Sequence, residues 1–354
     1  MAMGASKLRE RRQLRLSVLP PPSPPPFTYQ EHPFGGLPST PTGSVGPVVE
    51  RLAELEKGGV LGHGAGGTVY MARHRRTGAE LAVKALRLHG GGGAALREAY
   101  VHLGVAAAAP DHTHVVRIHG VFPRPSCGDQ FLCLVLEYVP NGSLRDVLRR
   151  CGRLPEHAIA SVARCVLRGL RHLHRLGIVH GDVKPSNLLV GRHGEVKIAD
   201  FGASRHVSMR AAGIVGTPAY MSPERMDPEG FGAASPSAAA DFSSDVWALG
   251  VVLLECHAGR FPLVASGERP DWAALAVAVC FGGEPDVPVA ATPEFTSFVR
   301  RCLEKEWRKR ATVEELLGHP FVSGSPPCCA TNEWLANFHD ELPIVPRAEM
   351  IQPT

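Results

Sequence analysis

Three polar side chains with the chemistry of phosphoryl transfer lie close together within residues 178–190. Asp182, Lys184 and Asn187 follow one another at intervals of two and three residues between two apolar runs. A carboxylate can orient an attacking hydroxyl and accept its proton, a lysine can offset charge on a γ-phosphate, and an amide oxygen can help to hold Mg²⁺. Thirteen residues after Asn187, Asp200 follows an apolar segment and offers a second metal ligand. An Asp–Lys turn pair or a simple bend would explain each piece alone, but their order together predicts a phosphoryl-transfer site.

A glycine-rich segment at residues 62–69 fits the pattern G-x-G-x-x-G-x-V. Such segments are often plain turns, and in dinucleotide-binding folds the glycines open a helix. Strand-like residues follow here instead, so the pattern favours a β-turn-β flap whose backbone N–H groups lie over phosphates. The glycines of the pattern are Gly62, Gly64 and Gly67, and Val69 is its last residue.

A lysine within an apolar strand indicates a buried ion pair. Lys84 lies in the apolar segment 81–86, where a charged side chain is rare unless it has a partner. Glu98 lies in a segment of helical pattern and is the expected partner, whereas a solvated lysine at a strand edge is the alternative. The pair predicts a lysine that is held in place to contact phosphates.

The surrounding pattern predicts an α+β fold with two lobes. Periodicity predicts strands at residues 68–72, 81–86, 115–121, 131–138 and 196–198, and helices at 94–105, 143–150 and 155–176. Nine prolines fall in residues 1–46, which favours an extended chain without a core. We therefore expect a disordered, proline-rich arm over 1–54, a β-rich N-lobe over 55–138, a mostly helical C-lobe over 139–322 and a C-terminal tail over 323–354.

The composition fits a folded protein that binds neither nucleic acid nor membranes. Hydrophobic residues make up 44% and charged residues 20% of the 354 residues, which excludes a wholly disordered chain. A net charge of +4 is too small for a general nucleic-acid or membrane-surface binder. Residues 246–254 and 273–281 are about half the length that spans a membrane and are expected to be buried helices. The nine cysteines show no CxxC pair, which favours a reducing compartment, so we expect a cytoplasmic protein with the nucleus as a second location.

Taken in order, these features resemble those of a eukaryotic protein kinase over residues 56–322. Residues 219–224, Ala-Tyr-Met-Ser-Pro-Glu, are similar to the segment that closes the activation loop of such kinases. The resemblance implies that Glu224 pairs with Arg310 and that Asp245 is buried in the large lobe. The lysine two residues after the expected catalytic aspartate is the pattern of serine/threonine kinases.

Within the kinases, the resemblance is to MAP kinase kinases of the compact plant group, group D. It is carried by residues 216–225, Gly-Thr-Pro-Ala-Tyr-Met-Ser-Pro-Glu-Arg, by residues 259–263 with 269–273, and by residues 279–282. The resemblance implies a kinase that binds ATP and Mg²⁺ between its lobes and phosphorylates both a threonine and a tyrosine of a MAP kinase. An upstream MAP kinase kinase kinase is a second expected partner. An N-terminal cluster looks like a MAP kinase docking motif, although an ordinary basic terminus is the alternative: Arg9, Arg11, Arg12, Leu14 and Leu16.

The roles known in the family fall on matching positions of this sequence. The resemblance implies that Leu61, Gly62, Gly64, Gly67 and Val69 cover the nucleotide and that Lys84, held by Glu98, contacts its phosphates. It implies Asp182 as the catalytic base, Lys184 as its charge partner, and Asn187 and Asp200 as ligands of Mg²⁺. It also implies Glu137 and Val139 as hinge residues that offer backbone groups to the adenine.

Three residues depart from the family pattern. Gly181 replaces the arginine that usually precedes the catalytic aspartate and pairs with a phosphate on the activation loop. Gly213 stands where a second phospho-acceptor is expected, in a loop that is shorter than usual. His102 takes a position that usually holds an apolar residue between the lobes, and we expect it to pack there in its neutral form. The first two losses lead to the hypothesis that activity does not depend on double phosphorylation of the loop.

Two other functions remain open on the sequence alone. A weakly active or inactive kinase-fold module that docks a MAP kinase would fit the three departures, whereas the intact set of lysine, aspartates and asparagine favours an enzyme. An upstream kinase that acts on MAP kinase kinases would keep the same site and differ only in its partner. The docking motif argues against that second alternative.

Overall fold

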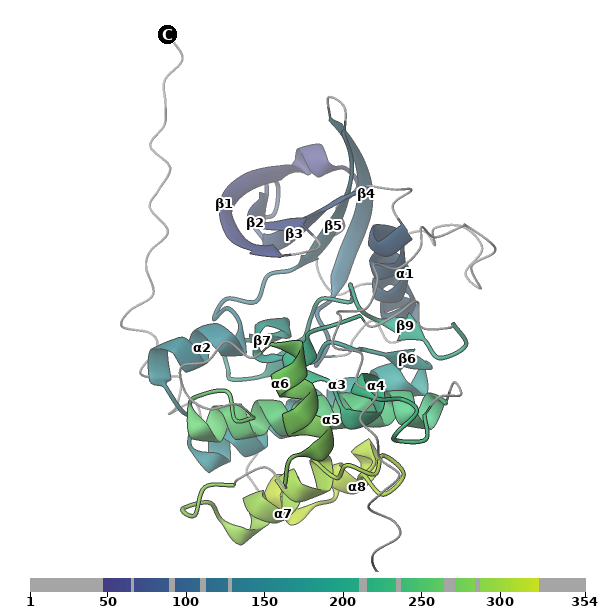
Figure 1. Cartoon of the computed structure of the whole chain (residues 1–354). Coiled ribbons are helices and arrows are strands. Elements are labelled where there is room, and N and C mark those ends of the chain that lie inside the picture. The colour runs from purple at the N-terminus through teal and green to yellow at the C-terminus, as the bar shows by residue number, and fades with distance from the viewer. Residues whose placement is uncertain are drawn as a thin grey trace, which may run out of the picture.

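The small lobe is a five-stranded antiparallel sheet that one helix covers (Figure 1). The computed structural model describes residues 47–324 apart from 65–66, 89–92, 109–112, 127–128, 210–214, 234–236, 264–270 and 284–286. The strands lie in the order β1-β2-β3-β5-β4. Their bounds are β1 Leu55–Gly64, β2 Gly67–His74, β3 Glu80–Arg87, β4 Ile118–Ser126 and β5 Asp129–Glu137, and the helix is α1, Gly93–Ala108.

Alternating apolar residues of the central strands form the core of this lobe. On one face of β3, Ala82 and Leu86 pack with the buried side of α1, whereas Leu81 packs on the other face with Val135 of β5. Val49, within the segment expected to be an arm, is only 3% exposed and joins this second cluster. The packing of the small lobe therefore begins before residue 55, because an apolar side chain upstream of β1 fills the outer face of the sheet.

The large lobe is built around two long helices, α3 (Glu156–Arg175) and α5 (Ala238–Ala258). Both are buried along most of their length and share one hydrophobic core with Phe295 and Phe298. α5 ends at Gly259, whose φ of 70° gives the left-handed conformation that closes a helix. The other elements are α2 Leu144–Cys151, α4 Pro223–Met226, α6 Trp272–Ala276, α7 Pro293–Cys302, α8 Val313–Leu317 and α9 Pro320–Ser323, the π-helical turn η5 Val277–Phe281, and the 3-10 turns η1 Leu52–Glu54, η3 Pro185–Asn187 and η4 Pro218–Tyr220.

Two short antiparallel sheets hold the loops that carry the polar site residues. β6 (Ile178–Val179) pairs with β9 (Arg205–His206), and β7 (Leu188–Val190) pairs with β8 (Val196–Ile198). The loop with Asp182 runs from β6 to β7, and Asp200 follows the end of β8 by two residues. A backbone hydrogen bond of 2.9 Å from the Ala199 N–H to the Asn187 carbonyl joins the two loops. The pairing therefore places them side by side.

The fold class predicted from the sequence is confirmed, since the N-lobe is β-rich with one main helix and the C-lobe is mostly helical. The expectation of a buried helix at 273–281 was wrong in part. This segment is α6 followed by η5, and Val277 and Phe281 are 51% and 42% exposed. The segment is apolar all round, but only one side of it packs against the lobe. Among the described helices, none has both the length and the apolar character to cross a membrane.

Candidate active site

The glycine-rich segment joins β1 and β2 in a hairpin. Gly62 lies opposite Val69, and Gly64 lies opposite Gly67. Gly67 has a φ of +146°, and a Cβ there would lie 2.0 Å from the Ala85 carbonyl oxygen, so only glycine fits. This is the flap geometry that the spacing predicted, rather than a turn that opens a helix. Leu61 is 44% exposed on β1 and Val69 is partly buried, so both side chains lie at the surface of the sheet.

Lys84 is a buried lysine that forms ion pairs with one carboxylate from each lobe. Its Nζ is 2.6 Å from Glu98 Oε1 on α1 and 2.9 Å from Asp200 Oδ1 in the large lobe. The lysine is 6% exposed and the glutamate 2% exposed. Burial alone would lower the pKa of Lys84, but the charges of the two carboxylates outweigh it and raise that pKa above its usual value. The lysine is therefore charged, and the partner expected from the sequence is the observed one.

The hinge contains a second ion pair between the lobes. Glu137 ends β5, and its Oε1 contacts Nζ of Lys197 on β8. Its Oε2 accepts a hydrogen bond of 3.1 Å from the Arg117 N–H, so both carboxylate oxygens have partners. Val139 is 7% exposed and packs in the core of the small lobe. The side chain of Lys197, on the strand that precedes Asp200, therefore holds the hinge in place at Glu137.

Sequence reasoning missed Lys197, although a signal for it was present. Lys197 stands between two buried apolar residues in a strand, and Lys84 likewise has apolar neighbours on both sides in β3. The reasoning that assigned a buried partner to Lys84 applies equally to this lysine. The sequence could not show that the partner is the hinge glutamate, because the two residues meet only when β8 packs beneath β5.

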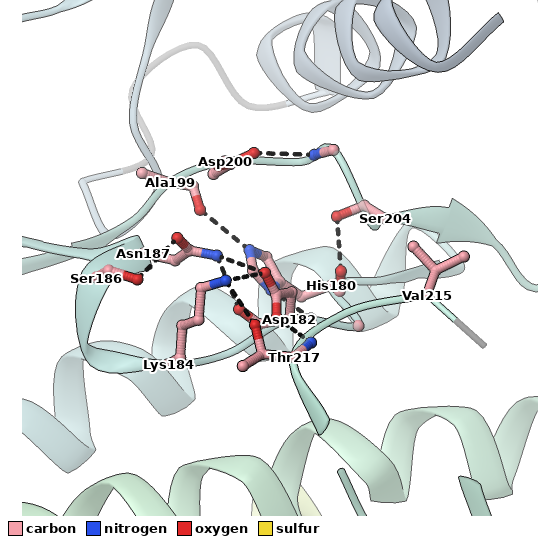
Figure 2. A network of polar contacts seen from close by, with 12 residues as sticks. His180, Asp182, Lys184, Ser186, Asn187, Ala199, Asp200, Ser204, Val215 and Thr217 are labelled. Atoms are coloured by element: carbon pink, nitrogen blue, oxygen red, sulfur yellow. Dashed lines mark hydrogen bonds and ion pairs between the residues drawn. The ribbon is translucent and has the colours of Figure 1, made fainter. Parts of the chain in front are cut away.

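The catalytic loop gathers Asp182, Lys184 and Asn187 around one carboxylate (Figure 2). Asp182 Oδ2 accepts a hydrogen bond of 2.6 Å from Lys184 Nζ and one of 3.1 Å from Asn187 Nδ2. Asp182 Oδ1 accepts a bond of 2.8 Å from the Thr217 N–H, and Lys184 Nζ also donates to Thr217 Oγ1 at 2.6 Å. The carboxylate is therefore held on both oxygens, and Thr217 is a member of the site that sequence reasoning did not assign.

His180 orients this loop from the interior. It is fully buried, and its Nδ1 accepts a bond of 3.2 Å from the Asp182 N–H while its Nε2 lies 3.2 Å from the Ala199 carbonyl oxygen. A ring that accepts at Nδ1 and donates at Nε2 is neutral, with its proton on Nε2. The histidine thus ties the backbone of the catalytic loop to the strand end that carries Asp200.

Asp200 combines an unusual backbone with a low pKa. Its φ of +67° lies in the left-handed region, which is rare for a residue other than glycine and costs about 1–3 kcal/mol where the surroundings impose it. Burial is the largest single influence on Asp200 and would raise its pKa, but the Lys84 charge together with the hydrogen bonds from Lys84 and the Gly202 N–H lowers that pKa. Its Oδ1 accepts bonds from Lys84 and from the Gly202 N–H at 3.1 Å. These contacts leave Oδ2 of an ionised carboxylate for a cation.

The oxygen atoms of the site fit Mg²⁺ bound together with phosphates. The amide nitrogen of Asn187 donates to Asp182, and its Oδ1 accepts one long bond of 3.5 Å from Ser186 Oγ, which leaves a lone pair of Asn187 Oδ1 as a ligand beside Asp200 Oδ2. Within the described residues, no three His, Cys, Asp or Glu side chains gather to hold a metal by themselves. Magnesium usually takes one or two protein oxygens and completes its shell with phosphate oxygens and water. Asn187 and Asp200 would supply that protein share.

Two buried groups of the large lobe support the loop. Asp245 is 1% exposed and accepts hydrogen bonds from the His180 N–H at 2.9 Å, the Gly181 N–H at 2.8 Å and His174 Nε2 at 2.9 Å. Burial alone would raise the pKa of Asp245, but these bonds keep it below its usual value. The pairing expected for Glu224 is also present, since Arg310 Nη1 and Nη2 contact its two oxygens at 2.7 and 2.9 Å.

Two residues that depart from the family pattern lie in this region: His102 contacts Phe201, and Gly181 lies near the loop that follows Phe201. His102 is 2% exposed, and its ring meets Phe201 edge-on with centroids 4.6 Å apart. Burial, with the nearby Lys84 charge, lowers the pKa of His102 to about 3, so the ring is neutral as expected. Gly181 has a φ of +76°. Gly213 and the docking cluster at residues 9–16 lie outside the described residues.

Comparison with known proteins also indicates a protein kinase. The family described as "Protein kinase domain" matches residues 55–322. Mitogen-activated protein kinase kinase 10 of Arabidopsis thaliana is 45% identical over 318 residues, which cover 89% of this chain and 98% of that protein. Mitogen-activated protein kinase kinase 9 of the same plant is 39% identical over 319 residues, covering 89% of this chain and 98% of the relative. Mitogen-activated protein kinase kinase 7 is 37% identical over 327 residues, covering 90% and 99%.

Proposed function

The chain belongs to the protein kinase family and, within it, to the MAP kinase kinases of plants, and we propose that it transfers the γ-phosphoryl group of MgATP to a threonine and a tyrosine in the activation loop of a MAP kinase. The observation that carries this proposal is that two clusters of charged and polar residues contain all the members expected, and that the members of each cluster are in contact. Lys84 is bound to Glu98 and Asp200, and Asp182 is bound to Lys184 and Asn187.

In the proposed reaction, Asp182 orients the substrate hydroxyl and accepts its proton. The substrate oxygen forms a bond to the γ-phosphorus, and the bond from that phosphorus to the β–γ bridging oxygen breaks, so that ADP leaves. Lys184 is within hydrogen-bond distance of Asp182 and offsets the charge that develops on the transferred group. Because the carboxylate is held on both oxygens before substrate arrives, little reorganisation is needed in the transition state.

The nucleotide is proposed to lie between the flap and the hinge. Leu61 and Val69 would cover the base and ribose, the backbone of Gly62, Gly64 and Gly67 would lie over the phosphates, and backbone groups of Glu137 and Val139 would bind the adenine. Lys84 would contact the phosphates, since its charge is fixed beneath the flap by two carboxylates. When bound through Asn187 and Asp200, Mg²⁺ would neutralise phosphate charge during transfer.

The protein partner is proposed from the family together with the N-terminal cluster. Arg9, Arg11 and Arg12 carry charge that suits an acidic patch, and Leu14 and Leu16 suit an apolar groove beside it. We propose that this motif docks the MAP kinase substrate and that an upstream MAP kinase kinase kinase acts on this chain.

A phosphotransfer assay tests the proposal. The full chain is incubated with MgATP and a plant MAP kinase that carries an inactivating substitution, and the phosphorylated residues are identified by mass spectrometry. We expect phosphate on both a threonine and a tyrosine of the substrate. Asp182→Asn keeps the size of the side chain but replaces one of its two acceptor oxygens by an amide donor and cannot accept the proton, so it should lower the rate by roughly 10²- to 10⁴-fold. Equal signals from the two proteins would refute the enzymatic function, and phosphate on only one residue would refute dual specificity.

A second candidate function is a kinase-fold module that docks a MAP kinase without phosphorylating it. Gly181 favours it, since no side chain at that position can receive a phosphate from the activation loop. His102 favours it as well, because a polar ring replaces an apolar contact between the lobes. In that case the wild type and Asp182→Asn would give the same background signal, and both would bind the MAP kinase equally.

A further inference from the structure

Arg225 joins the catalytic loop to the end of the activation segment through backbone groups alone. It lies in α4, directly after Glu224, and its Nη1 donates a hydrogen bond of 2.8 Å to the Gly181 carbonyl. Its Nη2 donates to the Val215 carbonyl. A guanidinium presents several N–H donors in a fixed plane, so one arginine can hold two carbonyls that come from different segments.

The two segments meet at an unusually short distance. Gly216 has a φ of +107°, and a Cβ at that position would lie 2.5 Å from the Gly181 carbonyl oxygen. Any side chain at 216 would therefore push the activation segment away from the catalytic loop. Because the backbones approach this closely, the carbonyls of residues 181 and 215 are near enough for a single side chain to bridge them.

This bridge lies immediately before the residue that contacts the catalytic carboxylate. Thr217 follows Val215 by two residues, donates its N–H to Asp182 Oδ1 at 2.8 Å, and accepts a bond from Lys184. A displacement of Val215 would be transmitted to Thr217 through one intervening glycine. The position of Arg225 thus bears on the orientation of Asp182, although Arg225 does not contact the reacting groups.

Groups of the protein itself surround Arg225. Burial has the largest effect and lowers the pKa of Arg225, and the neighbouring Arg205 charge lowers it further, whereas the carboxylates of Asp245, Asp182 and Asp241 favour its charged form. The neighbouring arginine, Arg205, is paired with Asp241 and donates to the Met209 carbonyl at 3.0 Å. Both arginines next to the segment are therefore bound to groups of the protein itself.

We propose that Arg225 is a positioning residue that fixes residues 215–217 on the catalytic loop by direct hydrogen bonds, in place of a phosphate on the activation loop. The inference rests on the proposed function, since it concerns the orientation of its catalytic base. It also gives a physical basis for activity that does not depend on loop phosphorylation. Lysine at 225 would keep the charge but could not present two N–H donors in one plane to both carbonyls.

The test compares Arg225→Lys and Arg225→Gln with the wild type. We expect kcat toward a MAP kinase to fall by roughly tenfold to a hundredfold in both variants, the usual effect of losing a hydrogen bond to a charged group. The KM for ATP should stay within about twofold, because the bridge does not contact the nucleotide side of the site. Arg308→Lys is the matched control: Arg308 also donates to a loop carbonyl, that of Gly232 at 3.1 Å, but this carbonyl lies in the segment after α4 rather than in the catalytic loop, and the kcat of this variant should not change.

Two further measurements separate positioning from general destabilisation and from failure of the proposed function. Treatment of the wild type with a protein phosphatase should leave its kcat unchanged. Amide hydrogen exchange at residues 215–217 should be slow in the phosphatase-treated wild type and faster in both Arg225 variants, whereas exchange within α3 should be equal in all three. This second readout needs no MAP kinase, so it tests the role of Arg225 even if no substrate is phosphorylated.

The idea is overturned if phosphatase treatment removes the activity of the wild type, since a phosphate would then hold the segment. Unchanged exchange at 215–217 in both variants would overturn it as well, and so would a fall in kcat that Arg308→Lys shares. If Arg225→Gln unfolds, Arg225→Lys, which keeps the charge and most of the volume, gives the deciding values.

Discussion

Replacing Lys197 by methionine is expected to destabilise the protein and to weaken its binding of ATP. Lys197 and Glu137 form an ion pair behind the hinge, with side chains that are 9% and 22% exposed. The pair joins β8 of the large lobe to the end of β5. Methionine keeps most of the length and apolar surface of the lysine, so the main change is the loss of a charge opposite a carboxylate that is largely buried.

The magnitude follows from that burial. Removing one partner of a fully buried pair costs about 3–5 kcal/mol, whereas exposed pairs contribute about 0–1 kcal/mol. Glu137 keeps part of its surface in solvent and retains the hydrogen bond from the Arg117 N–H at 3.1 Å. We therefore expect Lys197→Met to lower the free energy of unfolding by about 2–3 kcal/mol, below the range for a fully buried pair. Since the backbone of Glu137 is proposed to bind the adenine, the KM for ATP should rise several-fold with a smaller change in kcat.

A double-mutant cycle in urea denaturation measures this directly. Glu137→Gln removes the opposing charge and keeps an acceptor for Arg117, so Lys197→Met with Glu137→Gln should be only about 0–1 kcal/mol less stable than the wild type. Arg175→Met is the control, because Arg175 pairs with Glu314 at 3.0 Å on the surface and should cost under about 1 kcal/mol. If the two single losses simply add in the double variant, the pair is not coupled and the reasoning fails.

Two other predictions concern the small lobe and the arm. In the folded chain His102 has a pKa of about 3, against 6.5 for an ordinary histidine, so below about pH 6.5 the unfolded chain takes up a proton that the folded chain does not. The wild type should therefore lose up to about 1.4 kcal/mol per pH unit relative to His102→Leu as the pH falls from about 7 to 5; parallel stability curves in urea titrations would contradict this. Arg11→Glu with Arg12→Glu should raise the KM for a MAP kinase by about tenfold and leave the KM for ATP unchanged; an unchanged KM for the protein substrate would show that the arm does not dock it.

Local pattern was enough to predict four strands of the small lobe, the helices α1, α2 and α3, the strand β8 and the ion pair of Lys84. A lysine in an apolar strand must find a partner, and the only nearby carboxylate of helical pattern was Glu98, so the pairing followed from burial alone. The order of strands and helices followed from periodicity in the same way. The position of Asp182 among its partners was also expected, because its lysine and asparagine lie within five residues of it.

Contacts between distant segments could not be predicted in this way. Lys197 meets Glu137, 60 residues earlier in the chain, only when the lobes pack together, and Thr217 meets Asp182 only when the activation segment folds back. Arg225 follows a recognised motif residue and carries no sign of burial in its own neighbourhood. Its partners are backbone carbonyls, which every residue possesses, so no side-chain pattern could identify them.

The absence of an arginine at position 181 can be understood from the way the backbone of Gly181 is held. The N–H of Gly181 donates to Asp245 at 2.8 Å and its carbonyl accepts from Arg225 at 2.8 Å, so both backbone groups are held by side chains of the large lobe. Its φ of +76° is one that other residues adopt at a cost of about 1–3 kcal/mol, and a Cβ there would lie 3.0 Å from the Ala203 carbonyl oxygen. A glycine therefore suits this backbone better than an arginine. On the proposal made for Arg225, a loop that is anchored through the backbone of residue 181 would need no phosphate acceptor at 213, and the two departures would then be consequences of one arrangement rather than independent defects.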